Sequence, residues 1–274
     1  LLVYCLLHSQ FFLYIGMRLM MFKHGFILFL GSLLIGQDLT PEEILTYVAS
    51  HPKPESSITE IRLEITRKKK NKKKVKVREF SRYEKVYTSG KFTSKSLARF
   101  HKPKIVKGTS FLSWVYKNGK TDQWFALPKI QKAKKVKAKD RSKSFLNTDF
   151  TYEDLENRSL GSDSLFSLGS EYHEGNICKV IMAWPKEKSS YFSRKIWVNN
   201  HSWRIVKVEY YSTESDKEKT LYVSDFIKEN GFSIAGKMVM EKENGDKTVM
   251  EVMSYKPDIG LQDEVFTKDF LIKK

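Results

Sequence analysis

Apolar and polar residues alternate along much of the chain, as they do in a β-strand with one buried face. Residues 61–66 and 74–78 follow this pattern on either side of a lysine-rich run, which predicts two strands joined by a hairpin tip at 68–74. Asn-Gly and Asn-Asn pairs, typical of tight turns, separate several later segments. Further strands are predicted at 96–100, 109–117, 122–127, 177–184, 193–198, 203–211, 219–227, 237–242 and 247–255. Short strands at this spacing predict an antiparallel sheet.

One helix is predicted before the strands, at residues 41–49. Thr40 suits the N-cap, Pro41 fits the first helical position, and Glu43 completes a capping box. The helix carries a short apolar stripe and is expected to end before His51-Pro52. The stripe consists of Ile44, Leu45 and Val48.

The middle of the chain interrupts the strand pattern. Residues 145–160 are the second helix-capable segment, with Thr151 and Asp154 as a capping pair. Ser, Gly and Asp are frequent in 159–170, which predicts a loop.

The first 36 residues read as a leader, a secretory signal starting at Met21 with a doubtful upstream extension. Lys23 precedes the apolar run Phe26–Ile35, and this run is shorter than the roughly 20 residues of a spanning helix. A retained anchor helix is the alternative. We expect residues 37–274 to form a single exported domain in the periplasm, with association with a membrane surface as the alternative.

The net charge of +17 is concentrated in two segments. Residues 67–78 hold nine basic residues and no acid, and residues 129–143 form a second patch. The first patch lacks aromatic residues that stack on bases, so anionic head groups are expected as partners rather than nucleic acid. A solvated hairpin tip is the equally weighted alternative. The anionic-partner patch consists of Lys68, Lys69, Lys70, Lys72, Lys73 and Lys74.

Motifs for catalysis or cofactor binding are missing from the sequence. The six histidines lack zinc-binding spacing, and no serine-hydrolase elbow or glycine-rich phosphate loop occurs. Asp149, Glu153 and Asp154 can bind a cation or act as an acid/base pair, but capping of the local turns is favoured. Cys178 lies in an apolar strand and is expected to be a buried small residue. We expect no enzyme, no cofactor and no metal.

Residues 100–155 carry an ordered series of motifs. The order resembles that of the outer-membrane lipoprotein-sorting protein family, in the LolA/LolB-like superfamily, and the likeness extends over roughly 40–272. The matching positions are Phe100, Pro103, Lys107, Gly108, Phe111, Leu112, Trp124, Leu127, Pro128, Ser144, Phe145, Asp149, Phe150, Tyr152, Asp154 and Leu155.

This resemblance implies a mainly β (α+β) fold. Its strongly curved antiparallel sheet would form an incomplete β-barrel, with helices lining or capping the concave face over an apolar cavity. Superfamily members carry acyl chains between the inner and outer membranes. No lipid-anchor cysteine lies near residue 36, which favours a soluble carrier over an anchored receptor.

The expected function is therefore non-enzymatic: a monomeric periplasmic carrier that binds acyl chains of lipids or lipoproteins in an apolar cavity and moves them toward the outer membrane. An inner-membrane exporter and anionic head groups are candidate further partners. The rival is an envelope module with a filled core that docks on an exporter or anionic surface through its lysines. Phe145, Phe150 and Tyr152 form a lid or pack in place, and packing is favoured. A one-residue register error would invert any assignment of strand faces. The candidate cavity residues are Ile61, Leu63, Ile65, Val75, Val77, Phe111, Trp124, Met182, Trp184, Ile196 and Val198.

Overall fold

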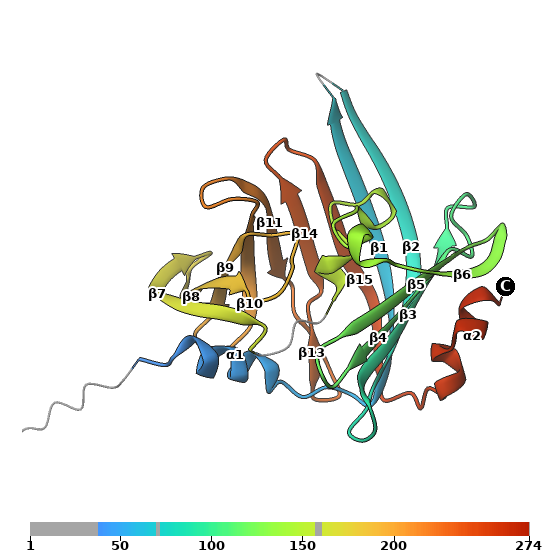
Figure 1. Cartoon of the computed structure of the whole chain (residues 1–274), viewed down its shortest axis with the longest axis horizontal. Helices are drawn as coiled ribbons and strands as arrows, with labels where there is room; N and C mark the ends of the chain where they lie inside the picture. Colours follow the sequence, from blue (N-terminus) through green and yellow to red (C-terminus); the bar gives the residue numbers. More distant parts are fainter. Residues whose placement is uncertain (1–37, 70–71, 157–160, 274) are drawn as a thin grey trace, which may run out of the picture. The chain divides into compact units, whose positions relative to one another are not determined.

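Thirteen strands form one antiparallel sheet in the part of the chain that a computed structural model describes, residues 38–69, 72–156 and 161–273 (Figure 1). The strand order is β6-β5-β4-β3-β2-β1-β15-β14-β11-β10-β9-β8-β7, so β6 and β7 are its two edges and the sheet is not closed. The expected leader lies outside the described residues, as does Lys70. Sheet strands are β1 (Ser56–Lys69), β2 (Lys72–Val86), β3 (Phe92–Lys102), β4 (Ser110–Tyr116), β5 (Thr121–Leu127), β6 (Ile130–Lys135), β7 (Asp163–His173), β8 (Asn176–Pro185), β9 (Ser193–Asn199), β10 (Ile205–Tyr211), β11 (Lys217–Ser224), β14 (Lys237–Lys242) and β15 (Lys247–Pro257).

All nine strands predicted after residue 90 correspond to strands of the structure. The predicted hairpin is also present, and its strands pair as far as Lys69 and Lys72. Two short strands, β12 (Ile227–Glu229) and β13 (Phe232–Ile234), form a separate ribbon around the predicted Asn230-Gly231 turn. The prediction of a mainly β protein with a large antiparallel sheet is confirmed.

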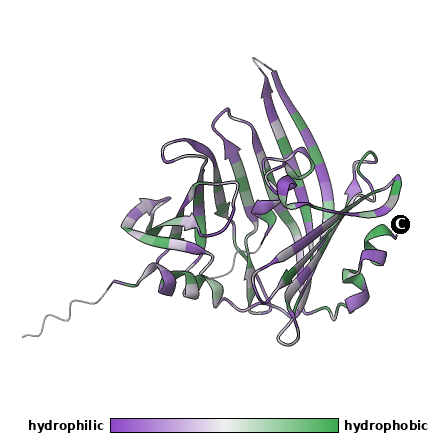
Figure 2. Cartoon of the chain, in the orientation of Figure 1, coloured by the Kyte–Doolittle hydropathy of each residue, from purple (hydrophilic) through white to green (hydrophobic). Residues whose placement is uncertain are grey.

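Hydrophobic and hydrophilic residues follow one another along the strands (Figure 2). Since successive side chains of a strand point to opposite sides, the sheet has two faces of different composition. We define the inner face as the face of the sheet whose side chains form the largest buried cluster. Leu63, Phe111 and Ile196 belong to this cluster. The outer face carries a second cluster around Leu97 and Leu112, and α2 (Lys268–Ile272) packs there through Leu271.

Helix α1 (Pro41–Ala49) forms as the sequence predicts. The Thr40 hydroxyl accepts a hydrogen bond from the Glu43 N–H, and the Glu43 carboxylate accepts one from the Thr40 N–H, which completes the capping box. Ile44 is buried in the inner-face cluster, with Leu45 and Val48 packed beside it. The described helices lack the length and apolar character that crossing a membrane requires.

The prediction of a helix within 145–160 is wrong for the residues that the structure describes. Only two 3₁₀ turns occur there, η2 (Phe145–Asn147) and η3 (Glu153–Leu155). Leu146 and Asn147 have φ values of 49° and 61°, and two consecutive left-handed residues interrupt helical hydrogen bonding. The Thr151–Asp154 capping pair does form, with reciprocal bonds of 2.7 and 3.2 Å, but it precedes a single 3₁₀ turn.

The prediction of a loop at 159–170 is also wrong where the structure describes it. Residues from Asp163 onward form β7, an edge strand that pairs only with β8. Most of its side chains are exposed. An edge strand gains its hydrogen bonds from one neighbour and needs no continuous apolar face, so a serine-rich sequence can adopt it.

The connection between β6 and β7 links the two edges of the sheet. We call its described part, residues 136–156, the strap. It crosses the inner face, and the sheet bends around it (Figure 1). Its contacts reach the adjacent central strands β2, β1 and β15, and also β5 and β11 on either side of them.

Candidate functional site

The strap places an aromatic underside on the inner face. Phe145 and Phe150 are each 4% exposed and belong to the inner-face cluster. The Phe145 ring meets the Phe111 ring edge-on, with centroids 5.0 Å apart, and Tyr152 packs against both rings. The two phenylalanines are thus packed against the sheet in the structure, as the packing alternative expects, while their role as a lid stays a prediction.

Arginines of the β1–β2 hairpin hold the left-handed turn of the strap. Arg78 donates to the Leu146 carbonyl at 2.5 Å, and Arg67 donates to the Asn147 carbonyl at 2.6 Å. Arg67 also forms a 2.8 Å ion pair with Asp149. Burial, with a smaller contribution from Arg67, lowers the pKa of Arg78. The turn is thus held by two cations from the paired strands β1 and β2.

Asp149 is buried and also bonds to β15, the neighbour of β1 on the side away from β2. Its N–H donates to the Thr248 hydroxyl at 3.0 Å, and that hydroxyl donates back to the Asp149 carboxylate at 2.7 Å. Since Thr248 is fully buried on β15, this reciprocal pair of hydrogen bonds attaches the strap to the centre of the sheet.

Lys219 of β11 holds the other end of the strap. It is fully buried, donates to the Asp154 carboxylate at 2.6 Å and to the Asp149 carbonyl at 3.1 Å, and lies over the Tyr191 and Tyr210 rings. The Tyr191 hydroxyl donates to Asp154 at 2.8 Å. Burial and the nearby carboxylate raise the pKa of Tyr191, which stays a hydrogen-bond donor.

Glu153 fastens the strap to the loop before β9. Its carboxylate accepts hydrogen bonds from the Ser189 hydroxyl and from the hydroxyl and N–H of Ser190, at 2.5 to 2.8 Å. Burial alone would raise the pKa of Glu153, but these bonds and the nearby Arg141 charge hold it below its usual value. Arg141 in turn pairs with Glu156.

The three acids thus serve attachment of the strap. Asp149 and Asp154 bind cations of the sheet, and Glu153 binds serines. No described group of histidine, cysteine, aspartate or glutamate has an arrangement that would hold a metal ion.

Six of the predicted cavity residues come together on the inner face under the strap. They are buried members of one cluster, which also contains Phe145 and Phe150. These six are Ile61, Leu63, Ile65, Phe111, Ile196 and Val198.

The other five lie elsewhere. Val75 and Val77 are 44% and 37% exposed. The pairing of Lys69 with Lys72 places Ile65 opposite Lys76, so Val75 and Val77 point to the outer face. Met182 and Trp184 alternate with Ile181 and Ala183, which belong to the inner-face cluster. Trp124 packs in the outer-face cluster, opposite Leu112.

Gly108 and Pro128 of the motif series are neighbours on the outer face. Gly108 has a φ of 81°, a conformation suited to glycine, and a Cβ placed there would lie 3.7 Å from the Pro128 ring. Both residues line a cavity beside α2.

Cys178 is buried as predicted, packed with Val180 and Trp197, and its thiol is free. Burial raises its pKa, which disfavours the reactive thiolate.

The described lysines of the anionic-partner patch are all exposed. β15 pairs with β1 only up to Thr66, and β3 pairs with β2 only from Glu79 onward. The tip of the β1–β2 hairpin therefore extends beyond the neighbouring strands (Figure 1).

The residues that anchor the strap from the sheet were not predicted. A signal for them exists in the sequence. Arg67 follows residues 61, 63 and 65 at the same two-residue spacing, and Lys219 lies two residues before Leu221, so each basic residue shares the inner face with apolar residues. A basic residue in phase with an apolar row predicts a buried or half-buried cation, and such a cation needs an acidic partner.

Comparison with known proteins identifies a family. A family model described as "-like: Uncharacterized protein" matches residues 92–273, more than half of the chain. The chain belongs to this family. A search of curated proteins found no match.

Solved structures share the fold. A Vibrio parahaemolyticus domain named for outer membrane lipoprotein sorting is 24% identical, with a TM-score of 0.77 over 85% of this chain and 98% of that one. A DUF1329 family protein from Desulfovibrio piger has the same identity and TM-score, over 84% and 97%. The LolA superfamily protein NE2245 from Nitrosomonas europaea is 19% identical, with a TM-score of 0.63 over 85% and 99%. The resemblance read from the sequence is confirmed at the level of the fold.

Proposed function

We propose that this protein is a non-enzymatic carrier of the bacterial periplasm that binds acyl chains of lipids or lipoproteins on its inner face. The observation that carries the proposal is the apolar inner face of an unclosed sheet covered by a strap. Six cavity residues from β1, β4 and β9 meet there. The likeness of the fold to proteins named for lipoprotein sorting points in the same direction.

In this proposal, the strap side chains occupy the acyl site when no cargo is bound. Phe145 and Phe150 fill the space between Phe111 and the strands on the other side. Fully burying such a side chain contributes roughly 3 kcal/mol, so the two rings contribute about 6 kcal/mol. A sixteen-carbon chain offers roughly 12 kcal/mol gross, less several kcal/mol for ordering. An acyl chain can therefore replace the strap rings at little net cost.

In this proposal, the polar contacts of the strap control the exchange of acyl chains, whereas its apolar underside occupies their binding site. Arg67 is the accessible part of this attachment, since its side chain is 32% exposed whereas Asp149 is 2% exposed. A membrane surface or an exporter that competes for Arg67 would loosen the turn at Asn147 and give an acyl chain access.

The test is acyl binding by the purified protein. Mass spectrometry of gently extracted ligand and displacement of a fluorescent fatty acid should both report an acyl chain. Arg67→Gln should speed association of the probe several-fold, while Arg82→Gln should leave it unchanged, because Arg82 pairs with Glu84 at 3.0 Å on the same hairpin. A ligand-free protein without acyl affinity would contradict the proposal.

The projecting lysine tip favours a second candidate function, docking on an anionic membrane surface or exporter. Replacement of Lys69, Lys72 and Lys73 by glutamate should then abolish binding to vesicles that contain phosphatidylglycerol. Acyl binding in solution should survive this change if the carrier proposal is right, so the two functions can be separated.

A further inference from the structure

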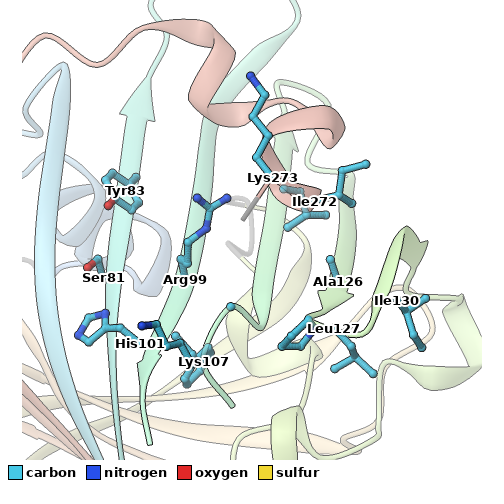
Figure 3. Close-up of a pocket in the computed structure, with 14 residues that line it drawn as sticks. Ser81, Tyr83, Arg99, His101, Lys107, Ala126, Leu127, Ile130, Ile272 and Lys273 are labelled. Atoms are coloured by element: carbon cyan, nitrogen blue, oxygen red, sulfur yellow. The ribbon is translucent and has the colours of Figure 1, made fainter. Parts of the chain in front are cut away.

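The outer face holds a cavity of about 390 Å³ between β3, β5 and α2 (Figure 3). Its wall is mainly apolar, and none of its fourteen lining residues carries a carboxylate. Leu127 and Ile130 are each 37% exposed at its edge. The apolar wall comprises Ala126, Leu127, Pro128, Ile130, Leu271 and Ile272.

Basic side chains lie at the same cavity. Arg99 projects from β3 between Tyr83 and α2, and Lys107 and Lys273 line the cavity from a loop and from the chain end (Figure 3). His101 also lines it and lies 3.7 Å from Glu60, whose carboxylate accepts a hydrogen bond from the hydroxyl of the lining residue Ser81 at 2.9 Å. The cavity thus combines an apolar wall with a surplus of positive charge.

Arg99 is the central cation of this group. It donates to the Phe270 carbonyl at 2.5 Å and to the Ser110 hydroxyl at 3.3 Å, and its guanidinium stacks on the Phe270 ring. Across the described ranges, it forms no ion pair with an acid. Burial lowers the pKa of Arg99, which is the response of a cation whose desolvation no carboxylate offsets.

We infer that this cavity binds a single-chain anionic amphiphile, such as a fatty acid, with its anionic end at Arg99 and its chain along Leu127, Ile130 and Ile272. The volume lies within the usual range for small-ligand sites. An apolar ligand would leave Arg99 without an anionic partner, and a small anion would leave the apolar wall uncovered. This site lies on the opposite face from the strap and is independent of the proposed function.

The inference has two parts, an anionic contact at Arg99 and an apolar wall along the chain, and three probes separate them. Palmitate carries both features, hexadecanol has the chain without the anion, and inorganic phosphate has the anion without the chain. Calorimetry should show palmitate binding more tightly than either of the others. Arg99→Gln should weaken palmitate binding roughly 10- to 100-fold, the range expected for loss of a charge-assisted hydrogen bond. Arg204→Gln is the matched control, because Arg204 is also half-buried, donates to a carbonyl (Ser233) and lies over a ring (Phe226).

A second variant tests the apolar half and avoids the contact between Arg99 and α2. Leu127→Glu changes a side chain at the exposed edge of the cavity and should remove palmitate binding here without unfolding the protein. If both faces bind acyl chains, the stoichiometry should fall by one; if the inner face binds none, binding should disappear. Palmitate binding that neither variant changes, or phosphate binding as tight as that of palmitate, would overturn the inference.

Discussion

Lys219 is a cation without exposed surface, and among the described residues the acid that it pairs with belongs to the strap. Asp154 supplies the carboxylate, the Asp149 carbonyl a second acceptor, and two tyrosine rings complete the surroundings. A buried pair of this kind contributes little compared with a well-packed apolar pair, but removal of one partner leaves a desolvated charge. The pair therefore fixes where the strap sits.

Lys219→Met should lower the free energy of unfolding by about 3–5 kcal/mol, because it leaves the Asp154 carboxylate buried and unpaired. Adding Asp154→Leu should restore part of this loss, so the two changes should be far from additive in urea unfolding. Lys217→Met is the control: Lys217 is 34% exposed and pairs at the surface, so its loss should cost less than about 1 kcal/mol. Additive effects of the two buried changes would contradict the pairing.

Residue-scale prediction from the sequence succeeded where one face of a strand is clearly apolar. Ile61, Leu63 and Ile65 alternate with polar residues, and all three are buried. It failed at Met182 because residues 177–184 are apolar on both faces, so alternation gives no direction. It failed at Val75 because the pairing of Lys69 with Lys72 places Ile65 opposite Lys76, so Val75 takes the other face of β2.

The strap is the element on which the proposed mechanism depends, and its attachment is mostly polar. Hydrogen bonds and ion pairs with the Leu146 carbonyl, Asp149, Glu153 and Asp154 surround the two buried phenylalanines. The sequence indicated the motif residues of this segment, but not its form. Two left-handed residues, which local propensity does not predict, replace a helix by a turn whose carbonyls face the arginines.

Acid should loosen the strap through Glu153. The folded state holds the pKa of Glu153 below its ordinary value of 4.5, so the carboxylate contributes stability above that value, and this contribution is lost as pH falls through the lowered folded pKa. Hydrogen exchange of the strap amides, corrected for intrinsic rates, should therefore accelerate below about pH 4.5. Glu153→Gln should show weaker acid dependence. Equal acid dependence in both proteins would show that another group controls attachment.

At the scale of the whole molecule, strand order links the fold to the site. Because β6 and β7 are the two edges, the segment between them must cross a face of the sheet, and the strap crosses the inner one. The sequence predicted the other strands of the sheet and the fold family, but it missed the two edge strands, β6 and β7. The serine-rich sequence of β7 has no buried face, and the position of the strap depends on where that edge lies.

The outer face has its own cover, α2, and its own cavity. One curved sheet thus presents two apolar surfaces of different character. The inner surface is covered by the strap, which polar contacts hold in place, and the smaller outer surface is open and lies beside basic side chains. Measurements of acyl binding by this protein need to separate them.

Photo-crosslinking with a diazirine-bearing palmitate in the Leu127→Glu variant tests the central claim most directly. That variant removes the outer-face site, so labels report on the inner face alone. The account predicts labelled peptides from β1, β4 and β9, centred on Leu63, Phe111 and Ile196, together with the underside of the strap. Absence of labels from these strands, or labels only on exposed surfaces, would contradict a carrier site on the inner face.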